Sequence, residues 1–288
     1  MDMFKGLGVA MVTPFNADGT IDFVGLEKLT NHLVDGGVNY LVVMGTTGEN
    51  PTISNAEQQE ILQKVKEVNA GRLPIVLGIG GNSTDAVVSR LKSEDLSGVD
   101  AILSVSPYYN KPSQEGIYQH FKAINDASPL PVIMYNVPGR TGSTVSAETT
   151  VRIAQLSNIV ATKEATGSFD ICMDIVNTKP EDFGVVSGED GYTLPFIAAG
   201  MQGVISVIAN AYPKEFSQMV NYALDGDYKN AKHLHYKLWP SMKAIFMDGN
   251  PGGVKYILSK MGICENHFRL PVVPVDDSTM KALDAAMI

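Results

Sequence analysis

Residues 158–167 read NIVATKEATG, a short β-branched run that ends in a lysine and is followed by a turn. Such a pattern predicts a buried strand and the loop after it. Seven similar runs flank this one, and successive runs start between 20 and 34 residues apart. They begin near Gly8, Tyr40, Pro74, Asp100, Leu130, Phe183 and Gly203. The regular spacing indicates one repeating unit along most of the chain.

Stretches with the apolar spacing of helices lie between the predicted strands. The main ones cover residues 22–35, 55–69, 83–97, 114–125 and 147–156. Strands that alternate with helices imply a parallel sheet, and eight such units in about 220 residues match a closed barrel better than an open doubly wound sheet. We therefore predict an α/β fold, a (β/α)8 TIM barrel, over residues 1–224.

The alternation of strands and helices stops after Leu224. Three helical stretches remain, at residues 228–247, 253–261 and 277–287, with turns rich in glycine or proline between them. We expect them to form a C-terminal helical subdomain, residues 225–288, that packs on the barrel, because no long linker separates the two parts.

The composition is that of a globular, acidic chain. Hydrophobic residues make up 44% and charged residues 18% of the 288 residues, and the formal net charge is −9. No basic run occurs, so nucleic acid and anionic membranes are poor partners and small molecules are expected. Cys172 and Cys264 form no C-x-x-C pattern, which favours a reducing cytoplasm over a disulfide framework. Residues 1–15 predict a first strand and not a signal peptide.

Lys163 is the main candidate for chemistry at the strand ends, where barrels of this kind build their active sites. It is the only one of the 17 lysines that ends an apolar strand run. A lysine inside a barrel is desolvated, so its neutral amine can attack a carbonyl and form a Schiff base. A structural ion pair with Glu164 or Glu189 is the alternative, and position alone leaves both open.

Metal and cofactor chemistry lack support in the sequence. None of the five histidines falls at a predicted strand end, and His233 and His235, two residues apart, would face different sides of a helix. No dinucleotide or nucleoside triphosphate motif occurs in the chain. We therefore expect neither a metal nor a cofactor.

Several polar residues in the predicted loops could bind or activate a substrate, and each also has a plainer interpretation. Arg140, within VPGRTG, could clamp a carboxylate or be an exposed loop charge. Thr46 and Thr47 could hold a second carboxylate or begin a helix. Three tyrosines at the barrel mouth could relay protons or fill space: Tyr108, Tyr109 and Tyr135.

Five longer segments occur in order at the predicted mouths of strands two, four, five, six and seven: GTTGE (45–49), SPYYNKPSQEGIYQHF (106–121), YNVPGRTG (135–142), KEATG (163–167) and SGED (187–190). In these segments the chain resembles the dihydrodipicolinate synthase (4-hydroxy-tetrahydrodipicolinate synthase) family, within the pyruvate-dependent class I aldolase and N-acetylneuraminate lyase superfamily. The resemblance covers essentially the whole chain. N-acetylneuraminate lyase, which shares the lysine and the tyrosine, is the runner-up, and Arg140 favours the synthase.

The resemblance implies roles for the residues that match the family's motifs. Lys163 would condense with pyruvate while Tyr135 passes protons. Thr47 would link Tyr135 to Tyr109 in a hydroxyl relay, and Thr46 and Thr47 would hold the pyruvate carboxylate.

The resemblance also implies a second substrate and an assembly. The backbones of Gly188 and Ile205 would line the site, and Arg140 would receive the carboxylate of L-aspartate 4-semialdehyde. The product would be 4-hydroxy-tetrahydrodipicolinate, formed in the first committed step of diaminopimelate and lysine biosynthesis. Tyr109 would reach across a tight dimer interface, and two such dimers would form a homotetramer. The chain departs from the family's NPIPVK segment, since residues 250–255 read NPGGVK.

Relatives that are inhibited by L-lysine use an allosteric cleft at the dimer interface. This chain keeps Asn82 and Tyr108 of that cleft, but Ala86 stands where a glutamate would accept a hydrogen bond from the ammonium of the ligand. Asn55 and Gln58 occupy positions where sensitive relatives often carry histidine. A missing charge-assisted hydrogen bond costs about 1.5 to 3 kcal/mol. We therefore predict weak or absent inhibition by lysine.

Overall fold

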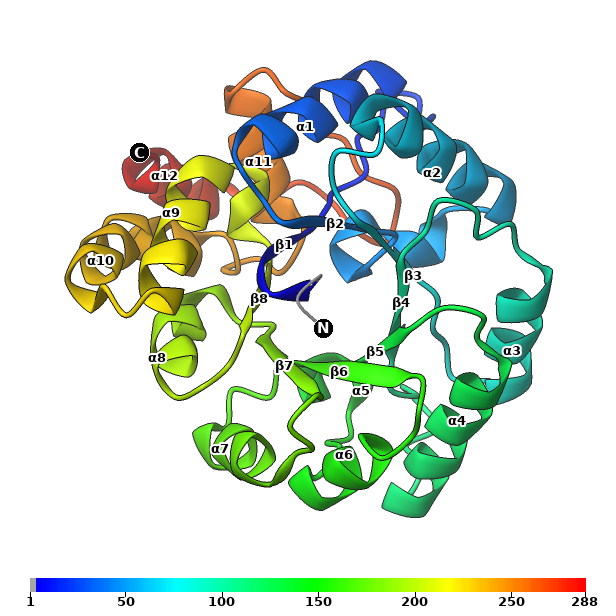
Figure 1. Ribbon diagram of the computed structural model, residues 1–288. Coiled ribbons are helices and arrows are strands. Elements are labelled where there is room, and N and C mark those ends of the chain that lie inside the picture. Colours follow the sequence, from blue (N-terminus) through cyan, green and yellow to red (C-terminus); the bar gives the residue numbers. More distant parts are fainter. Residues whose placement is uncertain (1–3) are drawn as a thin grey trace.

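The computed structural model describes residues 4–288 and contains the predicted closed barrel of eight parallel strands. Figure 1 shows the strands around a central axis, with helices outside them. The strands pair in sequence order, and β1 closes on β8. They are β1 (Gly6–Ala10), β2 (Tyr40–Val43), β3 (Ile75–Gly78), β4 (Ala101–Val105), β5 (Val132–Asn136), β6 (Ile159–Glu164), β7 (Gly184–Ser187) and β8 (Gly203–Ser206). The predicted strands are thus confirmed, and residues 1–3 of the predicted first segment lie outside the described residues.

The helices that follow the strands form the outer layer of the barrel (Figure 1). They are α1 (Phe23–Asp35), α2 (Asn55–Asn69), α3 (Thr84–Ser93), α4 (Gln114–Ala127), α5 (Pro138–Thr141), α6 (Ala147–Ile153), α7 (Phe169–Thr178), α8 (Thr193–Ala198) and α9 (Pro213–Leu224). The predicted end of the third long helix at residue 97 was wrong. Helix α3 ends at Ser93, because Glu94 adopts an extended backbone conformation with φ −78° and ψ 147°.

Serine side chains begin five of these helices. Each accepts a hydrogen bond from the backbone N–H three residues later, which satisfies one of the free donors at a helix start. The five serines are Ser54, Ser83, Ser113, Ser146 and Ser168. These caps determine where each loop after a strand ends, and therefore how much chain remains to build a site at the barrel mouth.

An irregularity between β5 and β6 determines which way Lys163 points. Val132 pairs with Ile159 and Ile133 pairs with Ala161, so β6 carries one extra residue at this place. Because side chains alternate along a strand, a shift by one residue exchanges the inner and outer faces. Ala161 therefore packs in the cluster inside the barrel, and Lys163, two residues on, shares that face.

Three helices follow the barrel: α10 (Tyr228–Ala244), α11 (Gly252–Lys260) and α12 (Asp277–Ala286). Helix α10 packs against α9, and α11 packs against α12. The two glycines of NPGG allow close packing at the start of α11, because a Cβ on Gly253 would lie 2.5 Å from the carbonyl oxygen of Ile245 and one on Gly252 would lie 2.8 Å from Val275 Cγ1. Within residues 4–288, none of the helices combines the length and the apolar character needed to cross a bilayer.

Candidate active site

Most of the predicted site residues line one cavity of about 320 Å³ at the carboxyl ends of the strands. Lys163 and Tyr135 come from β6 and β5, and their residues are 5% and 7% exposed. The other predicted residues that line this cavity are Thr46, Thr47, Arg140 and Gly188. Ile205 lies on β8 and is fully buried in the cluster inside the barrel. The barrel topology thus gathers side chains that are separated by more than a hundred residues in the sequence.

Lys163 is desolvated, and no ion pair found among the described residues includes it. Burial lowers the pKa of its amine to about 8. Its Nζ lies 4.3 Å from the centre of the Tyr135 ring. At pH 7 about a tenth of this amine is therefore neutral and nucleophilic, far more than for an exposed lysine.

Glu164, the neighbour of Lys163, faces away from the cavity and is fully buried. Its carboxylate accepts hydrogen bonds from Thr162 Oγ1 at 2.9 Å and from Asn136 Nδ2 at 3.0 Å. Burial raises the pKa of this carboxyl group to about 8. Since Asn136 also exchanges hydrogen bonds with the backbone of Val145, Glu164 anchors the loop that carries Arg140. The structural pairing of Lys163 with Glu164 is not found.

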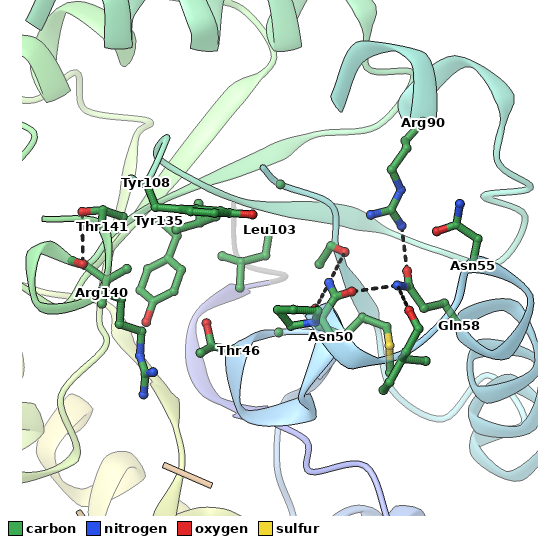
Figure 2. Close-up of a pocket in the computed structure, with 18 residues that line it drawn as sticks. Thr46, Asn50, Asn55, Gln58, Arg90, Leu103, Tyr108, Tyr135, Arg140 and Thr141 are labelled. Atoms are coloured by element: carbon green, nitrogen blue, oxygen red, sulfur yellow. Dashed lines mark hydrogen bonds between the residues drawn. The ribbon is translucent and has the colours of Figure 1, made fainter. Parts of the chain in front are cut away.

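Tyr135 and Arg140 lie together at the cavity. Burial raises the pKa of the Tyr135 hydroxyl to about 12, and the nearby positive charge of Arg140 opposes this rise. Figure 2 shows the hydroxyl end of Tyr135 directed toward the Arg140 side chain, with Thr46 beside it. Arg140 itself is exposed, on the short helix α5. A guanidinium at this place can receive the carboxylate of an entering molecule.

The two threonines lie in a tight 3₁₀ turn, η2 (Thr46–Gly48), directly after β2. Thr13 Oγ1 donates to the Gly48 carbonyl at 2.7 Å, which holds the turn against the segment that follows β1. Asn250 Nδ2 donates to Thr47 Oγ1 at 2.9 Å and lines the same cavity. Because Thr47 Oγ1 accepts this bond, its own O–H remains available as a donor. Sequence reasoning missed Asn250, which no local pattern connects with the turn.

Tyr109 does not line the cavity within a single chain. Its side chain is 87% exposed, and its backbone has a positive φ of 72°. Positive φ is unfavourable for a bulky residue. The predicted hydroxyl link from Thr47 to Tyr109 is therefore not made within one copy of the described residues.

A second cavity of about 520 Å³ adjoins the first, and Thr46, Tyr135 and Arg140 line both. Figure 2 shows its polar side, where Arg90 donates to Gln58 Oε1 at 2.7 Å and Gln58 donates to Asn50 Oδ1 at 2.8 Å. Of the two predicted allosteric residues, Tyr108 lines this cavity. Asn82 does not, and its carbonyl accepts a hydrogen bond from Asn110 at 2.9 Å.

The described residues hold no group of three or more His, Cys, Asp or Glu side chains arranged to bind a metal ion. The two cysteines are buried, and burial raises the pKa of each thiol to about 11. Across the described part of the chain, the cavity presents the Lys163 amine, hydroxyl groups, the Arg140 guanidinium and the carboxyl group of Glu189, which forms no ion pair with Lys163.

Comparison with known proteins places this geometry in a family. A family model described as the Dihydrodipicolinate synthetase family matches residues 3–287. The 4-hydroxy-tetrahydrodipicolinate synthase of Flavobacterium psychrophilum is 52% identical over 285 residues, which cover 99% of this chain and 97% of that protein. The dihydrodipicolinate synthase structure from Thermotoga maritima is 41% identical with a TM-score of 0.96, covering 99% of this chain and 97% of that chain. The enzyme from Acinetobacter baumannii, solved in complex with pyruvate, is 40% identical with a TM-score of 0.95, covering 98% and 97% of the two chains. This chain therefore belongs to the dihydrodipicolinate synthase family of enzymes.

Proposed function

We propose that this chain condenses pyruvate with L-aspartate 4-semialdehyde through a Schiff base on Lys163 and yields 4-hydroxy-tetrahydrodipicolinate for diaminopimelate and lysine synthesis. The observation that carries the proposal is the desolvated Lys163 amine at the wall of a cavity that it shares with Tyr135 and a threonine turn. The pyruvate complex of the A. baumannii relative supports pyruvate as the first substrate. The family name supports the second substrate and the product.

The first step joins pyruvate to the enzyme. The neutral Nζ of Lys163 attacks the keto carbon, a C–N bond forms, and the keto oxygen leaves as water after it has received protons. Tyr135, whose ring lies beside Nζ, is the group that passes these protons. Thr46 and Thr47 hold the carboxylate with their hydroxyl groups, and Asn250 leaves the Thr47 proton free to donate.

The second step forms the carbon bond. Loss of a methyl proton converts the imine into an enamine, whose carbon attacks the aldehyde carbon, and the resulting alkoxide takes up a proton. Arg140 binds the carboxylate of the aldehyde at the cavity entrance. The substrate amine then attacks the imine carbon, closes the ring and releases Lys163. These steps need only proton transfers and no oxidant, reductant or metal ion.

We also propose that Tyr109 completes the site of a second copy within a cytoplasmic homotetramer built from two tight dimers. Its exposure and its strained backbone support a role that needs a partner. Tyr109→Phe and Lys163→Ala, inactive alone, should regain activity when mixed under subunit exchange, because one site then receives both normal residues. Absence of recovery after verified exchange would place Tyr109 outside the partner's site.

We propose that the adjoining cavity, which Tyr108, Asn55 and Gln58 line, is the position of an allosteric cleft. Ala86 and the neutral Asn55 and Gln58 support weak or absent binding of lysine there.

Borohydride trapping tests the proposed function. The protein is incubated with pyruvate, reduced and digested, and the adduct should lie on the peptide that carries Lys163. Incubation with N-acetylneuraminate instead of pyruvate serves as the control for the lyase alternative. A wild-type protein left unmodified at Lys163 by pyruvate would overturn the Schiff-base proposal, and cleavage of N-acetylneuraminate would favour the lyase.

A further inference from the structure

The residue that directly follows the threonine turn, Glu49, forms a buried ion pair. Glu49 follows η2, and its Oε1 accepts a hydrogen bond from Lys255 Nζ at 2.9 Å. The two side chains are 1% and 0% exposed. Lys255 lies on α11, 206 residues away along the chain, so the pair joins the C-terminal helices to the mouth of the barrel.

The surroundings fix both partners in place. Lys255 Nζ also donates to the His267 carbonyl at 2.5 Å and lies 4.5 Å and 4.4 Å from the ring centres of Phe15 and Phe268. The other carboxylate oxygen of Glu49 accepts from the backbone N–H of Arg269 at 3.3 Å. Buried charges are tolerated when they are paired and hydrogen-bonded in this way. These contacts hold the pair in a single geometry, whereas an exposed ion pair samples many.

The backbone transmits this geometry to the threonines. The N–H of Glu49 donates to the Thr46 carbonyl at 3.1 Å, which closes the η2 turn. Glu49 adopts the left-handed conformation, with φ 57° and ψ 30°. Such a backbone persists only when its surroundings hold it. The ion pair and the Asn250 bond to Thr47 thus hold the turn from two points of the C-terminal segment.

We propose that Lys255 is a positioning residue, which acts through Glu49 to hold the Thr46–Thr47 turn in the geometry that receives the pyruvate carboxylate. This inference rests on the proposed function. Hydroxyl groups bind a carboxylate well only when their orientation is already fixed, because ordering them at the moment of binding weakens affinity. The C-terminal helices are then part of the pyruvate site although Lys255 touches no substrate.

The experiment uses three variants of the pair: Glu49→Gln, Lys255→Met, and the double variant that combines both. Glu57→Gln is the matched control. Glu57 pairs with Arg269 of the same C-terminal segment, but their side chains are 28% and 20% exposed. Glutamine at position 57 can retain the helix cap on Ser54. Each full-length protein is measured for the pyruvate concentration that gives half-maximal borohydride trapping, for the aldehyde KM, and for its thermal midpoint.

We expect Glu49→Gln and the double variant to need at least about tenfold more pyruvate, equivalent to about 1.4 kcal/mol, with a change below threefold in the aldehyde KM. Glu57→Gln should stay within twofold of the wild type in pyruvate trapping. The double variant should regain thermal stability relative to Lys255→Met, since no unpaired charge is left buried, while its pyruvate requirement stays high.

Two results would overturn the inference: a folded Glu49→Gln or Lys255→Met variant with unchanged pyruvate trapping, or a double variant that regains pyruvate binding together with its thermal midpoint. The second result would mean that the pair serves stability alone. If Lys255→Met does not fold, the other two variants still decide. A wild type that pyruvate does not modify would instead remove the proposed function itself.

Discussion

Among residues 4–288, two lysines are buried, Lys163 at the end of β6 and Lys255 in α11, and each has its amine over an aromatic ring. Burial lowers the pKa of both. Lys255 has a carboxylate at 2.9 Å that compensates its charge, whereas Lys163 has no ion pair among the described residues and opens on a cavity. Burial alone therefore does not produce a nucleophile, because the absence of a close partner and the access of a substrate are also required.

The largest expected effect follows from removing the unpaired lysine. Lys163→Ala should lower kcat by at least about 10³-fold, because the covalent intermediate cannot form. Its thermal midpoint should not fall, since the variant no longer buries an uncompensated amine. Steady-state kinetics and calorimetry check the two parts. Substantial residual activity in a preparation free of wild-type enzyme would contradict the nucleophile assignment.

Removing the paired lysine, Lys255, should destabilise the protein, in contrast to removing Lys163. Lys255→Met leaves Glu49 buried without its partner, which we expect to lower the free energy of unfolding by about 3 to 5 kcal/mol. Urea unfolding of the variant and of the double variant with Glu49→Gln measures this loss and its recovery. An unchanged unfolding midpoint in Lys255→Met would show that the Lys255–Glu49 ion pair does not stabilise the folded protein.

Arg140→Ala separates the step at Lys163 from the step that follows it. The aldehyde KM should rise and kcat/KM for the aldehyde should fall roughly ten- to a hundredfold, because a charge-assisted carboxylate contact is lost. Pyruvate trapping on Lys163 should remain. If trapping falls as strongly as the aldehyde kinetics, Arg140 acts on the first substrate instead.

The pH dependence of trapping tests whether Lys163, the lysine without an ion pair, has a lowered pKa. With the pKa of Lys163 lowered to about 8, the rate of imine formation in the free enzyme should rise with pH below 8 and level above it. The rise should approach tenfold per pH unit, because only the neutral amine attacks. Stopped reactions at saturating borohydride over pH 6 to 10 measure the profile. A rate that keeps rising to pH 10 would show that burial does not depress this pKa.

The smallest effect is expected from L-lysine. Ala86 stands where lysine-sensitive relatives carry a glutamate, so half-inhibition should require more than about 1 mM lysine, which corresponds to roughly −4 kcal/mol of binding. A titration at saturating substrates checks this expectation, with Ala86→Glu as the matched variant that should increase sensitivity. Strong inhibition of the wild type would mean that other groups of the cleft bind the ligand.

The sequence by itself determined the barrel and singled out Lys163 as the main candidate for chemistry, although position alone left its role open. Strand and helix periodicity are local properties, so β1 to β8 could be located from runs of a few residues. A lysine at the end of an apolar strand identified Lys163, and the barrel rule placed it at the mouth. The remaining site residues and their roles came from the motifs of a family, since each of their individual patterns allowed a structural interpretation.

Only the tertiary structure decided what holds the site together. The extra residue in β6 that turns Lys163 inward depends on pairing with β5, and Glu164 is stabilised by Asn136 from that neighbouring strand. The bond from Asn250 to Thr47 and the Lys255–Glu49 pair span 203 and 206 residues. Contacts at such separations leave no periodic signal in the sequence, because they arise from the closure of the barrel and the packing of α11 rather than from neighbouring residues.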